Sequence, residues 1–276
     1  MSGLELTGLE GKVAVVTGAG RMRSIGRPIA VEMAKAGCDI VLTGTGRSPD
    51  RYPDDEKAAG WRDIESVAEE VRATGRKALS LVSDVGDETA VRALVQGTLA
   101  EFGRVDFVVN NAGAARGRDR VPVLDMPIDA WDTVVRVNLR GTFLMSRFFG
   151  RQMVDAGNGG AIVNISSIAG KILPPNTSAY AASKAGIQAL TASMAQEVGQ
   201  FGVRVNAICP GLVGTYRMDD IAGTDAYKQM LATRIPLRRD GTGDEIAWAT
   251  IYLCSNQGSW ITGQSINIDG GMAVQH

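Results

Sequence analysis

Short apolar runs alternate with segments of helical periodicity along the chain. Seven runs, rich in β-branched residues, have the character of strands buried on both faces and lie at residues 13–17, 40–43, 77–82, 107–109, 161–165, 204–208 and 265–268. The segments between them space their apolar residues as helices do. This alternation predicts an α/β fold, a doubly wound parallel sheet of about seven strands with helices on both faces.

Three long helical segments are expected at 87–102, 129–156 and 180–201. Thr242 and Glu245 form a capping box for a further helix that reaches about Cys254. No linker divides the chain, so a single domain over residues 1–276 is expected. The mixed segment at about 214–239 is predicted to be a lid over a site.

Composition and charge narrow the function classes. The chain is 45% hydrophobic and 21% charged, with a net charge of -1, so no basic surface favours nucleic acid or an anionic membrane. No apolar run approaches a membrane span, and the start lacks a signal pattern. The three cysteines have no CxxC spacing, as expected of reduced thiols in a cytoplasmic protein.

The single histidine is His276, the last residue. A Ser-His-Asp or Cys-His nucleophile system is therefore excluded, and no metal site is expected. Acid–base chemistry has to use tyrosine, lysine or carboxylates.

A glycine-rich turn joins the first strand to the first helix. Such a turn directs free N–H groups and the positive end of the helix dipole at a phosphate, which predicts a dinucleotide site. Its predicted contact residues are Gly18, Arg23, Ser24, Ile25 and Gly26.

The end of the second strand bears on the choice of cofactor. NAD-binding folds place Asp or Glu here to accept from the ribose 2′-OH, whereas this chain has Gly44, followed by Thr45 and Arg47. A hydroxyl and a guanidinium suit a 2′-phosphate, with Arg23 as a second clamp, so NADP(H) is favoured over NAD(H). The polar loop 48–60 could cover the adenosine end of the cofactor, although an exposed surface loop is the simpler interpretation.

Tyr180 and Lys184 are one helical turn apart and therefore share a face. A free tyrosine has a pKa near ~10, and a neighbouring ammonium favours its phenolate, so this pair suits a proton donor or acceptor. The preceding strand, 161–165, delivers Ser167. The loop 116–120 contains three arginines and could bind an anionic substrate, although a solvated loop is the simpler interpretation.

Taken together, these residues closely resemble the single-domain short-chain dehydrogenase/reductase family over nearly the whole chain. The motifs that carry the resemblance are the Thr17–Gly26 turn, Asn110-Asn111-Ala112-Gly113, Asn138, Ser167, Tyr180-x-x-x-Lys184, Pro210-Gly211 and Asp269-Gly270-Gly271. The resemblance implies a Rossmann-type fold, interconversion of an alcohol and a carbonyl with NAD(P), and a homotetramer assembled through the 129–156 and 180–201 helices.

The resemblance also implies residue roles. Asn138, Ser167, Tyr180 and Lys184 would be catalytic, with Asn138 positioning a water on the proton path from Lys184. Tyr180 and Lys184 would also contact the cofactor. Its remaining contacts would come from residues after the strand ends: Asp84, Val85, Asn111, Ala112, Gly113, Pro210, Gly211, Val213 and Thr215.

The glycine segment is two residues longer than the family pattern, and Ser24 replaces its middle glycine. A Ser-Ile pair here resembles enoyl-thioester reductases of the same superfamily. Those enzymes place six residues between Tyr and Lys, whereas this chain places three between Tyr180 and Lys184, and the shorter spacing favours carbonyl chemistry. The expected activity is NADP(H)-dependent secondary-alcohol/ketone oxidoreduction on a small molecule. The alternatives are a 3-oxoacyl-thioester reductase, an NAD-dependent alcohol or sugar dehydrogenase, and an idle nucleotide-binding scaffold.

Overall fold

The computed structural model describes residues 5–274. Residues 1–4, part of the stretch on which the absence of a signal pattern was argued, and His276 lie outside the described residues. Among residues 5–274, no helix is long and apolar enough to cross a membrane.

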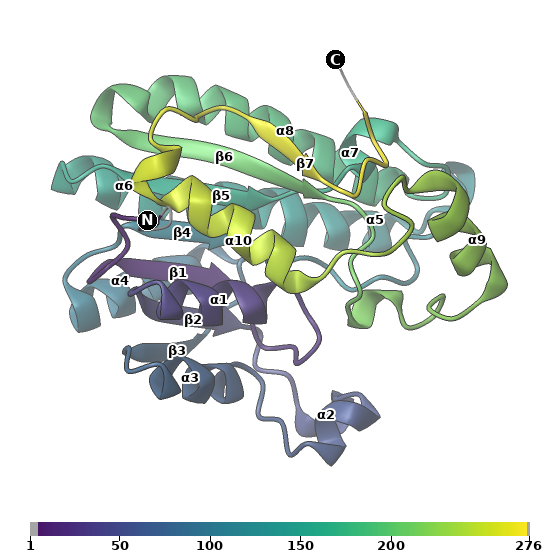
Figure 1. Ribbon diagram of the computed structural model, residues 1–276, viewed down its shortest axis with the longest axis horizontal. Helices are drawn as coiled ribbons and strands as arrows, with labels where there is room; N and C mark the ends of the chain where they lie inside the picture. Colours follow the sequence, from purple (N-terminus) through teal and green to yellow (C-terminus); the bar gives the residue numbers. More distant parts are fainter. Residues whose placement is uncertain (1–4, 275–276) are drawn as a thin grey trace.

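All seven predicted strands are present and form one parallel sheet, in the order β3-β2-β1-β4-β5-β6-β7 (Figure 1). Their bounds are Val13–Thr17 (β1), Asp39–Gly44 (β2), Ala78–Val82 (β3), Phe107–Asn110 (β4), Gly160–Ile165 (β5), Val203–Pro210 (β6) and Ser265–Ile268 (β7). The strand order reverses direction between β1 and β4, which is where ligands bind in folds of this kind. The predicted Rossmann-type α/β fold is confirmed.

Helices cover both faces of the sheet. They are Gly26–Lys35 (α1), Asp54–Ala58 (α2), Ile64–Ala73 (α3), Glu88–Phe102 (α4), Ile128–Val134 (α5), Gly141–Ala156 (α6), Ala169–Ile172 (α7), Ser178–Val198 (α8), Asp225–Arg234 (α9) and Gly243–Cys254 (α10). Helices α1, α3 and α10 pack on one face, and α4, α6 and α8 pack on the other. Short 3-10 turns lie at Pro49–Arg51, Val123–Asp125, Gly199–Phe201, Tyr216–Met218 and Asn256–Gly258.

The long helix expected at 129–156 is present as α5 and α6 joined by a π-helical turn, Val135–Arg140. Such turns add a residue to the helix and often lie at functional sites. Asn138 is in this turn.

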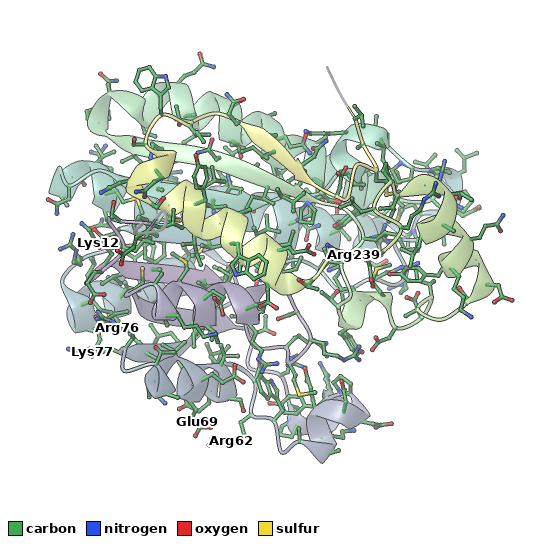
Figure 2. The ribbon with its side chains drawn as sticks, viewed as in Figure 1. Lys12, Arg62, Glu69, Arg76, Lys77 and Arg239 are labelled. Atoms are coloured by element: carbon green, nitrogen blue, oxygen red, sulfur yellow. The ribbon has the colours of Figure 1, made fainter. Side chains whose placement is uncertain are left out.

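The capping box predicted for α10 is also present: the Thr242 N–H donates to Glu245, and the Glu245 N–H donates to the Thr242 hydroxyl. Arg239, labelled in Figure 2, pairs with Glu245 and helps to lower the pKa of that carboxyl to about 2. The carboxylate also suits the positive end of the helix dipole.

Candidate active site

A cavity of about 840 Å³ opens where the strands end. It is lined by the loops that follow β1 to β6, by α8 and by the segment after β6. In Figure 1, α2 and α9 lie on the side of the molecule to which the strand arrows point. The sheet therefore brings residues from distant parts of the chain to one edge.

Most of the predicted site residues line this cavity. They are Gly18, Arg23, Ser24, Ile25, Thr45, Arg47, Asp84, Val85, Asn111, Ala112, Gly113, Ser167, Tyr180, Lys184, Pro210, Gly211, Val213 and Thr215. Gly26 and Asn138 lie behind the lining. A Cβ on Gly26 would be 2.5 Å from the Asn111 amide nitrogen and 2.9 Å from the Gly18 carbonyl oxygen, so this position packs the glycine-rich turn against β4.

The glycine-rich turn is held by hydrogen bonds between β1 and β4. The Thr17 hydroxyl accepts from the Asn111 and Ala112 N–H groups at 3.0 and 2.9 Å. Gly18 has a φ of 65°, and a Cβ there would be 2.7 Å from the Ala112 Cα. Ser24, which replaces the family's glycine, accepts from the Arg27 N–H in the first turn of α1. A helix N-terminus reached through a turn that has glycine at positions 18, 20 and 26 fits the pyrophosphate of a dinucleotide.

Residues 48–63, here termed the insert, dock on this turn. The Glu56 carboxylate is buried and accepts from the Met22 N–H at 2.9 Å. The Trp61 indole donates to the Gly20 carbonyl at 2.6 Å. Most residues of 48–60 are exposed, as the simpler interpretation of a surface loop expects, but Tyr52 and Glu56 are buried, and Glu56 ties the segment to the glycine-rich turn.

Arg47, one of the two arginines predicted to clamp a 2′-phosphate, is surrounded by carboxylates. Its guanidinium donates to Glu56 at 2.8 Å and to Asp63 at 3.4 Å, and its backbone N–H donates to Asp63 at 3.1 Å. Both carboxylates are buried. One cation faces two anions, so the group carries a net negative charge.

Asp63 is a residue that the sequence analysis missed. Its Oδ1 lies 3.8 Å from the position that a Cβ on Gly44 would take. The Asp63 carboxylate is therefore close to where an Asp or Glu side chain at position 44, the end of β2, would lie. Its backbone is strained, with a φ of 53°. The neighbouring Arg62 faces outward toward Glu69, at the edge of the molecule in Figure 2.

Arg23, the second predicted clamp, also has carboxylate partners. Its Nε donates to Asp55 of the insert at 2.7 Å, and its terminal nitrogens donate to both oxygens of Asp219. The Tyr216 N–H donates to the Arg23 carbonyl. Arg23 therefore joins the insert, the glycine-rich turn and the segment after β6.

Tyr180, Lys184 and Ser167 meet where β5 ends and α8 begins. Lys184 is buried, and its Nζ lies 5.7 Å from the centroid of the Tyr180 ring. The same Nζ donates to the Ile165 carbonyl at 2.7 Å. An ammonium has three donors. No other acceptor for it is seen among the described residues, so the remaining donors are available to a ligand.

The charges around Tyr180 adjust its acidity. Burial alone would raise the pKa of Tyr180, but the positive charges of Lys184, Arg217 and Arg120, together with a hydrogen bond from Ser167, lower this pKa. Burial lowers the pKa of Lys184, and the Arg217 charge acts in the same direction. The phenol is thus a better acid than a free tyrosine, which suits proton transfer near neutral pH.

Asn138 is fully buried, and both ends of its amide are hydrogen bonded. Its Oδ1 accepts from the Ala114 N–H at 2.8 Å, and its Nδ2 donates to the Ser183 hydroxyl at 3.0 Å. Ser183 in turn donates to the Tyr180 carbonyl at 2.7 Å. Asn138 therefore links the loop after β4 to the turn of α8 that carries Tyr180.

A family model described as "Enoyl-(Acyl carrier protein) reductase" matches residues 18–273. The chain belongs to the short-chain dehydrogenase/reductase family. It is therefore an NAD(P)-dependent oxidoreductase. Within the described part of the chain, no three His, Cys, Asp or Glu side chains gather as a metal site requires.

Named relatives extend over nearly the whole chain. A short-chain dehydrogenase/reductase, eriH, from Hericium erinaceus is 38% identical, with 94% of this chain and 96% of the relative covered. The 3-oxoacyl-[acyl-carrier-protein] reductase FabG of Staphylococcus aureus is 36% identical, with 95% and 98% covered. The crystal structure of a short-chain type dehydrogenase/reductase from Mycobacterium marinum matches with a TM-score of 0.86 at 33% identity, covering 99% of this chain and all of that one.

Proposed function

We propose that this enzyme interconverts a secondary alcohol and a ketone, with Tyr180 as the general acid in reduction and the general base in oxidation. The observation that carries the proposal is the placement of Tyr180 beside Lys184 and Ser167, with a lowered pKa, in the cavity. Ser167 would donate a hydrogen bond to the substrate oxygen, and Lys184 would stabilise the phenolate and hold the ribose. The nicotinamide, when bound, supplies or accepts the hydride.

Replacing Tyr180 tests this assignment. Tyr180→Phe removes the proton donor and leaves the ring, so turnover of a ketone panel is expected to fall roughly 100- to 10,000-fold. Cofactor affinity, measured by quenching of tryptophan fluorescence, should change little. Substantial turnover in the variant would overturn the role of Tyr180.

The proposed role of Asn138 is to position other residues. Its amide is used by Ala114 and Ser183, and it does not line the cavity. It would act through α8 on Tyr180, and its main effect would be on the orientation of that side chain.

We also infer a preference for NAD(H), in place of the NADP(H) expected from Thr45, Arg23 and Arg47. The support is the net negative charge of the Arg47 group and the place of Asp63 beside Gly44. A carboxylate accepts from a ribose 2′-OH and repels a 2′-phosphate.

Fluorescence titration with NADH and NADPH checks this preference without any substrate. The wild type is expected to bind NADH more tightly. Asp63→Asn keeps the shape of the side chain and tolerates a positive φ, so it should fold and bind NADPH about 10-fold more tightly than the wild type does. A wild type that prefers NADPH would contradict the inference.

A second candidate is reduction of a 3-oxoacyl thioester, the activity named for the Staphylococcus aureus relative. Two arginines that a carrier phosphate would need are paired: Arg116 with Asp220, and Arg118 with Asp129. Turnover of acetoacetyl-coenzyme A above that of simple ketones would favour this candidate. Activity on free ketones alone would exclude it.

We propose a homotetramer in the cytoplasm, with residues 214–239 acting as a lid. Phe143 on α6 and Phe201 after α8 are exposed apolar side chains on the segments expected to associate. All three cysteines are buried free thiols, as suits a reducing compartment. The proposed lid contains Tyr216, Arg217 and Met218 of the cavity lining.

A further inference from the structure

Two guanidinium groups converge on Tyr180 from separate segments. The Arg120 Cζ, in the loop after β4, lies 4.4 Å from the centroid of the Tyr180 ring. The Arg217 Cζ, in the lid, lies 5.5 Å from the same centroid. Together with Lys184 they place three cations around one phenol, and like charges at such distances repel. An anion bound among them would relieve that repulsion.

Most of the carboxylates near this end of the cavity are committed elsewhere. Asp219 is held by Arg23, and Asp220 lies 2.9 Å from Arg116. Asp119 is buried, accepts from the Gly117 N–H and lies 3.3 Å from the Arg120 Nε, so it offsets the charge of that one arginine and leaves Arg217 and Lys184 without a carboxylate partner among residues 5–274. These aspartates therefore leave the positive charge beside Tyr180 incompletely balanced.

Several N–H donors of the Arg120 and Arg217 guanidinium groups have no hydrogen-bond acceptor among the described residues. Arg217 donates to the Ala114 carbonyl at 2.6 Å, and no carboxylate lies within 4.0 Å of it among residues 5–274. The Arg120 Nε is buried and lacks a hydrogen-bond partner in the described structure, although Asp119 is 3.3 Å away. The terminal nitrogens of Arg120 make no hydrogen bond within residues 5–274, so their donors are available to a ligand in the cavity.

We propose that the substrate carries a compact oxyanion, a carboxylate or a phosphate, a few bonds from its reacting carbon, and that Arg217 and Arg120 bind this group. The inference rests on the proposed alcohol–ketone function. A guanidinium presents paired N–H donors that match two oxygens of either anion. Because both arginines adjoin the Tyr180 ring, the anion must be close to the carbonyl. The phosphate of a carrier thioester lies many bonds farther away and would not reach them.

The competing explanation is that both arginines only lower the pKa of Tyr180. In that case their loss would slow charged and neutral substrates alike, with a change in the pH profile. An anion-binding role changes the ratio of kcat/KM between a charged substrate and its neutral partner. The ratio therefore separates the two roles.

The experiment compares kcat/KM for acetoacetate with methyl acetoacetate, and for dihydroxyacetone phosphate with dihydroxyacetone. The wild type should favour the anion in one pair, which identifies carboxylate or phosphate. With each substrate reduced on the plateau of its pH profile, where the Tyr180 phenol stays protonated in both proteins, Arg217→Gln should cost roughly 10- to 100-fold on that anion and under about 3-fold on its neutral partner, since a charge-assisted bidentate contact is lost. Arg217→Lys should recover part of the loss. Arg118→Gln, an exposed arginine of the neighbouring loop, is the matched control and should leave the ratio unchanged.

A binding measurement keeps the proposal testable if none of the four probes is turned over. Malonate and inorganic phosphate should raise the melting temperature of the wild type and not that of Arg217→Gln. Equal shifts in both proteins, or a ratio unaffected by Arg217→Gln, would overturn the proposal. Turnover of neutral ketones with no preference for the anion would contradict the anion site and leave the proposed alcohol–ketone function intact. Binding of an anion without turnover of any carbonyl compound would contradict the proposed function and leave the anion site intact.

Discussion

Tyr180 lies among three cations, and its protonation controls both directions of the proposed reaction. Oxidation requires the phenolate, and reduction requires the phenol. Lys184, Arg217 and Arg120 stabilise the phenolate, while Ser167 supplies a hydrogen bond. The pH dependence of turnover should therefore report the charges around one ring.

Arg217→Gln is expected to move this pH dependence upward. Losing a cation raises the pKa of Tyr180, so the rate of alcohol oxidation, which rises as the phenolate forms, should reach its plateau at a higher pH than in the wild type. The limb on which ketone reduction declines should move in the same direction. The measurement is the pH profile of kcat with a neutral substrate, and a superimposable profile for the variant would contradict the electrostatic account. Arg118→Gln should show the wild-type profile.

At the scale of elements, the π turn at 135–140 connects the sheet to α8. It carries Asn138, whose amide spans the loop after β4 and the first turns of α8. Both partners are buried or partly buried, so the amide cannot be replaced by water without rearrangement. The turn thus supports the helix on which Tyr180 and Lys184 stand.

Asn138→Ala should lower the free energy of unfolding by about 1–3 kcal/mol, because it leaves the Ala114 N–H and the Ser183 hydroxyl without their partner. Urea denaturation measures the change. Arg151→Ala, at an exposed position of α6, should stay within about 0.5 kcal/mol of wild type. A loss of similar size in both variants would show that the amide adds nothing specific.

Elements were easier to predict than the contacts among them. The strands show in the sequence because most are short runs dominated by apolar, β-branched residues, and the α10 capping box involves residues three apart. Asp63 approaches Gly20, and Arg217 contacts Ala114, across 43 and 103 positions of sequence. Such contacts depend on how loops fold over the strand ends. The strained backbone at Asp63 was a further obstacle, since local preference argues against it.

For the molecule as a whole, assembly is the property to measure. Sedimentation should give a mass of four times the 29.1 kDa chain. Phe143→Glu, on the α6 surface expected to be covered, should produce smaller species, because a buried charge at an interface is costly. Leu124→Glu, at an exposed site outside those helices, should leave the assembly unchanged. A monomeric wild type would contradict the expected tetramer.

Arg23 has a consequence for the order of events in turnover. Its one side chain holds Asp55 of the insert and Asp219 of the proposed lid, so both segments depend on the same guanidinium. If residues 214–239 open to release product, as proposed, Asp219 would separate from Arg23, and the contact of Arg23 with Asp55 of the insert would weaken. Departure of product and exchange of cofactor then become parts of a single motion. Opening of the proposed lid, and not hydride transfer, would then be the rate-limiting step of turnover.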